Sequence, residues 1–212
     1  MAFDYKKEYK EYYQPPKKPA LTEIPPMHFL AVRGKGNPNA EDGAYQQALS
    51  RLYGVAFTLR MSRKAGKNIE GYFEYVVPPL EGLWQQNGSP DGSFDYSRKD
   101  DLSWISMIRL PDFITEADVQ WAIAEVQRKK QLDCSDVEFF TYDEGLCVQV
   151  MHIGSYDSEP ETIAQMTTYL TEQGCIADHS ETRMHHEIYL SDPRKAATEK
   201  LKTVIRIPVK RI

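Results

Sequence analysis

One order of segments occurs twice in this chain, and it constrains the fold more than any single motif. Residues 27–110 read as a strand, a helix and two strands, and residues 146–210 repeat this order. Each helix carries apolar side chains at helical spacing: Tyr45, Leu49, Leu52, Ala56 and Leu59 in the first, and Ile163, Met166 and Leu170 in the second. Two β-α-β-β units predict an α+β fold with pseudo-two-fold symmetry, in which antiparallel sheets surround a ligand cavity and the helices lie on the outer faces.

Turn and capping residues set the expected limits of these elements. Strands are expected at 27–33, 72–77, 82–86, 102–110, 137–142, 146–153, 185–190 and 203–209. Three pairs of polar residues at capping spacing predict helix starts: Asn39 with Asp42, Thr115 with Asp118, and Ser158 with Glu161. The middle pair opens a helix within residues 111–145, which we interpret as a helical insertion between units at about 27–110 and 146–210.

The N-terminal segment, residues 1–26, differs from the rest of the chain. Tyr5, Tyr9 and Tyr12 are spaced as on one helix face, and five prolines follow between positions 15 and 26. We therefore expect an arm that adds no strand to the sheet, followed by a single domain at 27–212. An arm packed on the domain and a partly disordered tail are equally compatible with these residues.

Charge and composition argue against several classes of function. The chain has 212 residues and a formal net charge of −5, which disfavours nucleic-acid binding, and no stretch approaches the roughly 20 apolar residues of a membrane helix. The N-terminus has no signal-peptide core, and the three cysteines have no paired spacing, so we expect reduced thiols in a cytoplasmic protein. No Gly-x-Ser-x-Gly elbow occurs. No metal site is expected, because no standard zinc spacing fits Cys175, His179, His185 and His186. No cofactor is expected either. The oligomeric state stays open.

Glu187 is the strongest candidate for a chemical role. Strand periodicity places it on one face with His185 and Tyr189, while Ile188 belongs to the opposite, apolar face, which suits packing against helices. Glu187 would then point away from the helices. A solvated strand face is one interpretation of this pattern. If the sheet encloses a cavity instead, a partly desolvated carboxylate beside a phenol is suited to act as a base.

Several aromatic side chains are candidates for a ligand-binding wall. Trp84, with Glu81 nearby, lies in the stiff segment VPPLEGLW, and Trp104 lies in an alternating strand. Phe140 and Tyr142 share a face of another strand. Each of these aromatic residues is compatible with stacking on a planar ligand and also with a role as core filler.

The chain resembles the GyrI-like small-molecule-binding superfamily, and within it the standalone branch that carries no DNA-binding domain. The resemblance rests on KKPALTEIPPMHFLAVRGKGNPN, YVVPPLEGLW, WISMIRLPDFIT, GLCVQVMHIGSYDSEPETI and HHEIYLSDPRKAATEKLKTVIRIPV. It implies paired β-α-β-β units around an aromatic cavity whose strand carboxylate corresponds to Glu187. Gln85 stands where close relatives are expected to have a second aromatic residue, and Thr198 stands where proline is usual.

The resemblance also implies a function. Some members of the standalone branch are hydrolases that open the cyclopropane of DNA-alkylating natural products, and the residues carried over are Glu187 and Trp84, followed by Tyr142 and Tyr189. The expected partner is therefore a planar, aromatic small molecule, which includes cationic compounds. Two alternatives stay open: a noncatalytic multidrug sensor or sequestering protein, and a gyrase-inhibitor-like interaction protein with an acidic surface.

Overall fold

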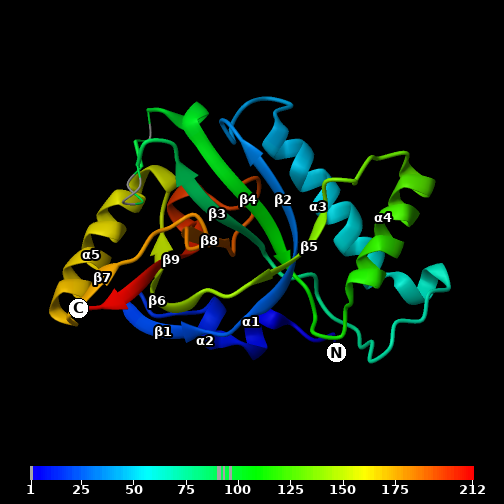
Figure 1. Cartoon of the computed structure of the whole chain (residues 1–212), viewed down its shortest axis with the longest axis horizontal. Helices are drawn as coiled ribbons and strands as arrows, with labels where there is room; N and C mark the ends of the chain where they lie inside the picture. The colour runs from blue at the N-terminus through cyan, green and yellow to red at the C-terminus, as the bar shows by residue number, and fades with distance from the viewer. Residues whose placement is uncertain (1, 90–91, 93, 96) are drawn as a thin grey trace.

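The computed structural model describes residues 2–89, 92, 94, 95 and 97–212 (Figure 1). The strands are β1 (Ala20–Ile24), β2 (Met27–Lys35), β3 (Leu80–Gln86), β4 (Leu102–Arg109), β5 (Glu138–Tyr142), β6 (Gly145–Ile153), β7 (Cys175–Ala177), β8 (His185–Tyr189) and β9 (Lys202–Arg211). The α-helices are α1 (Tyr5–Glu8), α2 (Lys10–Tyr13), α3 (Ala44–Arg60), α4 (Glu116–Lys130) and α5 (Glu159–Glu172). Among the described residues, no helix is both long and apolar enough to span a membrane.

The strands form one antiparallel sheet in the order β1-β6-β9-β8-β3-β4-β2-β5, and β7 pairs with β9. The predicted duplication is present as β2-α3-β3-β4 and β6-α5-β8-β9. In each unit the last of the three strands lies between the other two, and the two middle strands of the sequence order, β3 and β8, pair with each other at the centre. The α+β class and the two β-α-β-β units are therefore confirmed, with the two sheets merged into one.

Both unit helices lie on the same face of this sheet. From α3, the Tyr45 ring contacts Trp84 of β3 and Trp104 of β4 at centroid distances of 5.5 and 5.0 Å. From α5, Glu159 reaches His185 of β8, which pairs directly with Trp84 and so shares its face. Figure 1 shows α3 and α5 on opposite sides of the central strands, with α4 outside α3. The helices therefore cover the outer strands and leave the central pair between them.

The expectation that residues 1–26 add no strand is wrong. Ala20–Ile24 forms β1, an edge strand that pairs antiparallel with β6. The flanking residues Pro19 and Pro25 leave five residues free of proline, which is enough for an edge strand because only one side of its backbone needs a partner. The preceding turns α1 and α2 pack on the domain, and Tyr5 and Tyr13 are buried. Of the two alternatives for this segment, the structure shows the packed arm.

The strand expected at 72–77 is absent; within it only Tyr75 makes a bridge, to Phe3. This segment is held by side chains instead, since Arg60 Nε donates to the Tyr75 carbonyl and Arg63 to the Tyr72 carbonyl. The hydrogen-bonded strand begins only after Pro78 and Pro79, at Leu80.

Of the three predicted helix starts, the pair in α4 is confirmed as a capping box. Helix α3 begins after Gly43, because the Asn37 side chain accepts from the Asn39 backbone and closes a turn there. Helix α5 begins at Glu159 without a side-chain cap, because the Ser158 hydroxyl donates to the Ser155 carbonyl. Polar residues near a helix start thus form local turns as readily as caps.

Candidate functional site

A cavity of about 1350 Å³ opens on the sheet face that carries α3 and α5. Its floor is the central pair β3 and β8, and its walls come from α3, the start of α5 and the neighbouring loops. Aromatic and acidic side chains line it, among them Tyr45, Trp84, Tyr156, Glu159, Glu187 and Tyr189. The duplicated fold creates this cavity, because each helix covers its own half of the sheet and neither covers the central strands.

The aromatic side of the cavity is built around Trp84. Its indole Nε1 donates a hydrogen bond of 2.9 Å to the hydroxyl of Tyr189, and its ring lies 5.5 Å from that of Tyr45. Tyr156 meets Tyr189 edge-on at 5.9 Å. Gly82 permits this arrangement, since a Cβ there would lie 2.6 Å from the indole nitrogen. Rings fixed in this way offer a preformed surface for a flat ligand.

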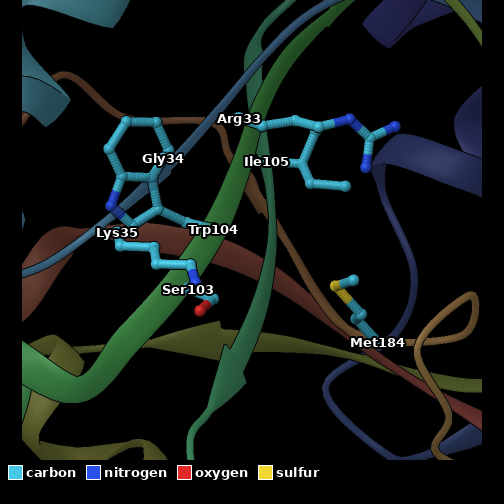
Figure 2. A pocket seen from close by; sticks show the side chains of 7 residues that line it. All are labelled: Arg33, Gly34, Lys35, Ser103, Trp104, Ile105 and Met184. Atoms are coloured by element: carbon cyan, nitrogen blue, oxygen red, sulfur yellow. The ribbon is translucent and has the colours of Figure 1, made fainter.

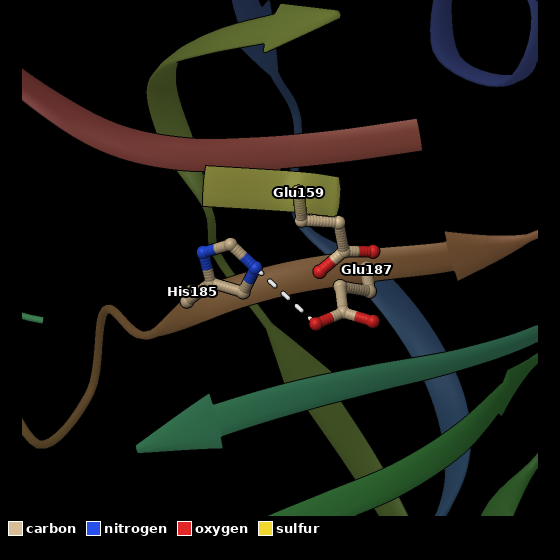
Figure 3. Close-up of side chains that lie close together, drawn as sticks. All are labelled: Glu159, His185 and Glu187. Atoms are coloured by element: carbon tan, nitrogen blue, oxygen red, sulfur yellow. Dashed lines mark ion pairs between the residues drawn. The ribbon is translucent and has the colours of Figure 1, made fainter. Parts of the chain in front are cut away.

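The acidic side of the cavity brings together Glu159, His185 and Glu187 (Figure 3). His185 Nε2 lies 3.3 Å from Glu187 Oε1, and one ligand atom from each residue lies within 4.8 Å of the others. Glu159 is only 2% exposed, and its Oε1 has no hydrogen-bond partner among the residues that the structure describes. A buried carboxylate oxygen without a partner costs free energy of folding. The Glu159 oxygen is therefore suited to contact a bound ligand or ion.

Burial sets the protonation of several groups in the cavity. Burial, followed by the charge of Glu187, raises the pKa of Glu159 well above its usual range, which favours its neutral form at pH 7. Burial likewise raises the pKa of Tyr45 and Tyr189, and raises the pKa of Tyr156 to about 12. These phenols therefore stay protonated and are available as hydrogen-bond donors.

Glu159 is a site residue that the sequence pattern did not predict. An acidic residue in the first turn of a helix is ordinary, because the helix dipole favours negative charge there. Its sequence position therefore carried no signal of a special role. Its place in the site comes from the fold, which brings the first turn of α5 against the face of β8 that lines the cavity.

Glu187 lines the cavity, but the orientation expected for it is wrong. It points to the face that carries α3 and α5, not away from it. The error arose because the apolar residue Ile188 suggested which face the helices cover. In the structure, His186 and Ile188 face the N-terminal arm, while Glu187 occupies the gap between the helices.

Three predicted binding residues, Glu81, Phe140 and Tyr142, lie outside the cavity. Glu81 precedes Gly82 on β3 and so projects to the arm face, where it bonds Tyr13. Phe140 and Tyr142 belong to β5 at the far edge of the sheet and pack in a separate cluster on that same face. The expectation that Tyr142 shares one cavity with Trp84 is therefore wrong, because β5 is separated from β3 by two strands.

Trp104 supports the cavity without lining it. It is 3% exposed, and Tyr45 covers its ring edge-on. It also borders a second, open pocket of about 310 Å³, whose residues include Arg33, Ile105 and Met184 (Figure 2). This smaller pocket has apolar walls and no carboxylate among the residues that line it.

A buried charged cluster occupies the arm face directly behind the cavity. His186 contacts Glu144 through Nδ1 at 2.8 Å and Glu81 through Nε2 at 3.0 Å. Arg206 donates to the other oxygen of Glu144 at 3.1 Å, and the Tyr13 hydroxyl donates to Glu81 at 3.2 Å. Each member of the cluster thus has a partner of complementary charge or polarity.

The same cluster fastens the N-terminal arm. Arg206 also bonds the Tyr12 carbonyl at 2.6 Å and the Gln149 amide oxygen at 3.1 Å. Burial alone would lower the pKa of His186, but Glu144 and Glu81 raise it to about 9. Burial alone would raise the pKa of Glu144, but His186 and Arg206 lower it to about 2. Arg206, which is paired with Glu144, therefore holds the arm in place through the Tyr12 carbonyl.

Comparison with protein families gives one match over most of the chain. The model of the GyrI-like small molecule binding domain matches residues 17–210. A search of curated proteins gives no significant match.

Solved structures from Listeria innocua are similar over the whole length. A protein described as a hydrolase is 41% identical, with 98% of this chain and 100% of that chain covered and a TM-score of 0.88. A conserved protein described as uncharacterized is 43% identical, with 98% and 100% covered and a TM-score of 0.91. The C-terminal domain of EcmrR, 15% identical over 92% of this chain and 98% of that chain, shares the fold with a TM-score of 0.55.

Proposed function

Because the chain belongs to the GyrI-like small-molecule-binding family, we propose that its cavity binds planar aromatic molecules and hydrolyses those that carry an electrophilic cyclopropane. The observation that carries this proposal is Glu187 beside the aromatic wall of Trp84 and Tyr189. The Listeria innocua protein described as a hydrolase supports a catalytic role. Such an activity would detoxify DNA-alkylating compounds.

The proposed chemistry needs one base and one hydrogen-bond donor. The oxygen of a water molecule bonds to the cyclopropane methylene, the strained carbon–carbon bond breaks, and its electron pair moves into the conjugated dienone. Glu187 accepts the water proton, and protonation of the resulting phenolate gives a phenol, so that the net change is addition of one water. A protonated phenol such as Tyr45 or Tyr189 is suited to stabilise the developing negative oxygen.

A noncatalytic drug-binding role has its own support. Among the described residues, Glu187 forms no ion pair with lysine or arginine, so its carboxylate is the negative group of the cavity floor. That charge suits a cationic planar ligand, with Glu187 as counter-charge. A sequestering protein would bind such compounds and return them unchanged.

Product analysis separates these two roles. The protein is incubated with a planar compound that contains a dienone-conjugated cyclopropane, and the mixture is followed by mass spectrometry. Hydrolysis predicts a product heavier by one water, formed in amounts that exceed the protein. Recovery of only the starting compound, tightly bound, would reject the catalytic proposal and leave the sequestering role.

Replacing Trp84 with alanine is expected to weaken the affinity for a planar aromatic dye by about 1–3 kcal/mol, the scale of a lost stacking contact and its buried area. Fluorescence titration measures this change. Trp121→Ala is the matched control, because Trp121 lies on α4 outside the residues that line the cavity. Unchanged affinity in a folded Trp84→Ala variant would show that Trp84 is only packing.

A further inference from the structure

Two His–Glu–Glu clusters lie on opposite faces of strand β8, which supplies the histidine of each. On the arm face, His186, Glu81 and Glu144 are joined by Arg206, whose guanidinium supplies a positive charge. On the cavity face, the cluster of Glu159, His185 and Glu187 has no lysine or arginine in ion-pair contact among the residues that the structure describes. Two carboxyl groups there converge on a single imidazole.

We propose that Glu159, His185 and Glu187 bind one divalent transition-metal ion at the floor of the cavity. The three side chains come from two rigid elements, β8 and the first turn of α5, and point toward one another (Figure 3). The unpartnered, buried Oε1 of Glu159 is the second observation, since a metal ion would satisfy it. The inference uses the cavity of the proposed function but not its reaction.

The geometry suits a small ion. A tetrahedral ion with bonds of about 2.0–2.2 Å holds its ligand atoms roughly 3.4 Å apart. His185 Nε2 and Glu187 Oε1 are already 3.3 Å apart, and all three ligand atoms lie within 4.8 Å. Small side-chain rotations, without movement of the backbone, therefore complete the three-ligand set. Glu159 and Glu187 line the cavity, which leaves the remaining position open to water or to a ligand oxygen.

The donor set indicates the class of metal. One imidazole nitrogen with two carboxylate oxygens favours Zn²⁺, Mn²⁺, Fe²⁺ or Co²⁺ over Mg²⁺ and Ca²⁺, which prefer oxygen ligands alone. Thiols do not compete for such an ion in the folded chain, because Cys134, Cys147 and Cys175 are all buried. An ion at this place would activate a bound water inside the aromatic cavity.

Isothermal titration of the chelator-treated full-length protein with ZnCl₂ tests the proposal. One binding site per chain is expected, and Glu159→Gln is expected to weaken it by at least about 100-fold, because losing a group that merely orients a ligand already costs roughly 10–100-fold. His185→Gln is expected to do the same. Asp157→Asn is the matched control, since Asp157 lines the cavity and its loss removes one charge but no proposed ligand. Its affinity is expected to stay near that of the unmodified chain.

Absence of saturable binding, or equal binding by the unmodified chain and by Glu159→Gln, would overturn the metal site. The titration contains no organic substrate, so its result is independent of the hydrolysis assay. If the protein binds no zinc but still forms product after chelator treatment, the metal site is rejected and the proposed function is supported. If the protein binds zinc but forms no product, the proposed hydrolysis is rejected and the metal site is supported.

Discussion

Glu187→Gln is expected to reduce the turnover of a cyclopropane-containing substrate by roughly 10²–10⁴-fold, the usual contribution of a general base, while the affinity for neutral planar ligands changes little. Glutamine keeps the shape of the side chain but cannot accept the water proton. Single-turnover kinetics and a binding titration on the same variant measure the two effects separately. Glu161→Gln is the matched control, because Glu161 is exposed on α5 and does not line the cavity.

The same variant distinguishes the other roles of this carboxylate. If Glu187 is only a counter-charge, Glu187→Gln is expected to weaken the binding of cationic ligands and to leave the binding of neutral ligands unchanged. In that case the unmodified protein shows no turnover. A side chain without a role predicts no change in turnover or in either affinity, which would contradict both proposals. Repeating the kinetics after chelation separates a base from a metal ligand, since a metal-free protein keeps its activity only if Glu187 acts as the base.

Arg206→Met is expected to lower the free energy of unfolding by about 3–5 kcal/mol, because removing one cation from a buried charged cluster leaves its carboxylates with less positive charge than they need, even though His186 still contacts Glu144. The Arg206 side chain is 3% exposed and contacts Glu144, which is equally buried. Methionine fills much of the volume but leaves Glu144 without that cation and the Tyr12 carbonyl without that donor. Urea denaturation followed by circular dichroism measures the loss.

An exposed arginine provides the control for this measurement. Arg194 pairs with Asp192, but its side chain is 85% exposed, so Arg194→Met is expected to change the unfolding free energy by no more than about 0.5 kcal/mol. Limited proteolysis adds a local readout, because trypsin needs an unfolded backbone beside the exposed lysines of the arm, which release of the arm in Arg206→Met would provide. If Arg206→Met were as stable as Arg194→Met and its arm equally protected, the cluster would not be what fastens the arm.

Local patterns were enough to predict the repeated units. Helical spacing located α3 and α5, and strand alternation located most of the sheet, because both periodicities follow directly from backbone geometry. Alternation also grouped His185, Glu187 and Tyr189 on one face, as the structure shows. The family resemblance and the α+β class followed from these segments and their sequences.

Alternation defines two faces of a strand but does not say what covers each of them. Ile188 suggested a face packed by helices, whereas the arm covers it and the helices flank Glu187 on the other side. The same limit explains Tyr142, since strand order depends on pairings between distant segments, and β5 joins the sheet beside β2. The proline-rich segment became strand β1 because β6 offered an open edge.

Glu159 shows the difference between chain and fold most clearly. As a residue of the chain it is an ordinary acid at the start of a helix. In the folded protein it is buried beside His185 and Glu187, which lie 26 and 28 positions further along the sequence. Periodicity acts over a few residues, so it determines the elements and the faces of each strand. The meeting of α5 with β8 depends on how the two units pack, and only the tertiary structure brings these three side chains together.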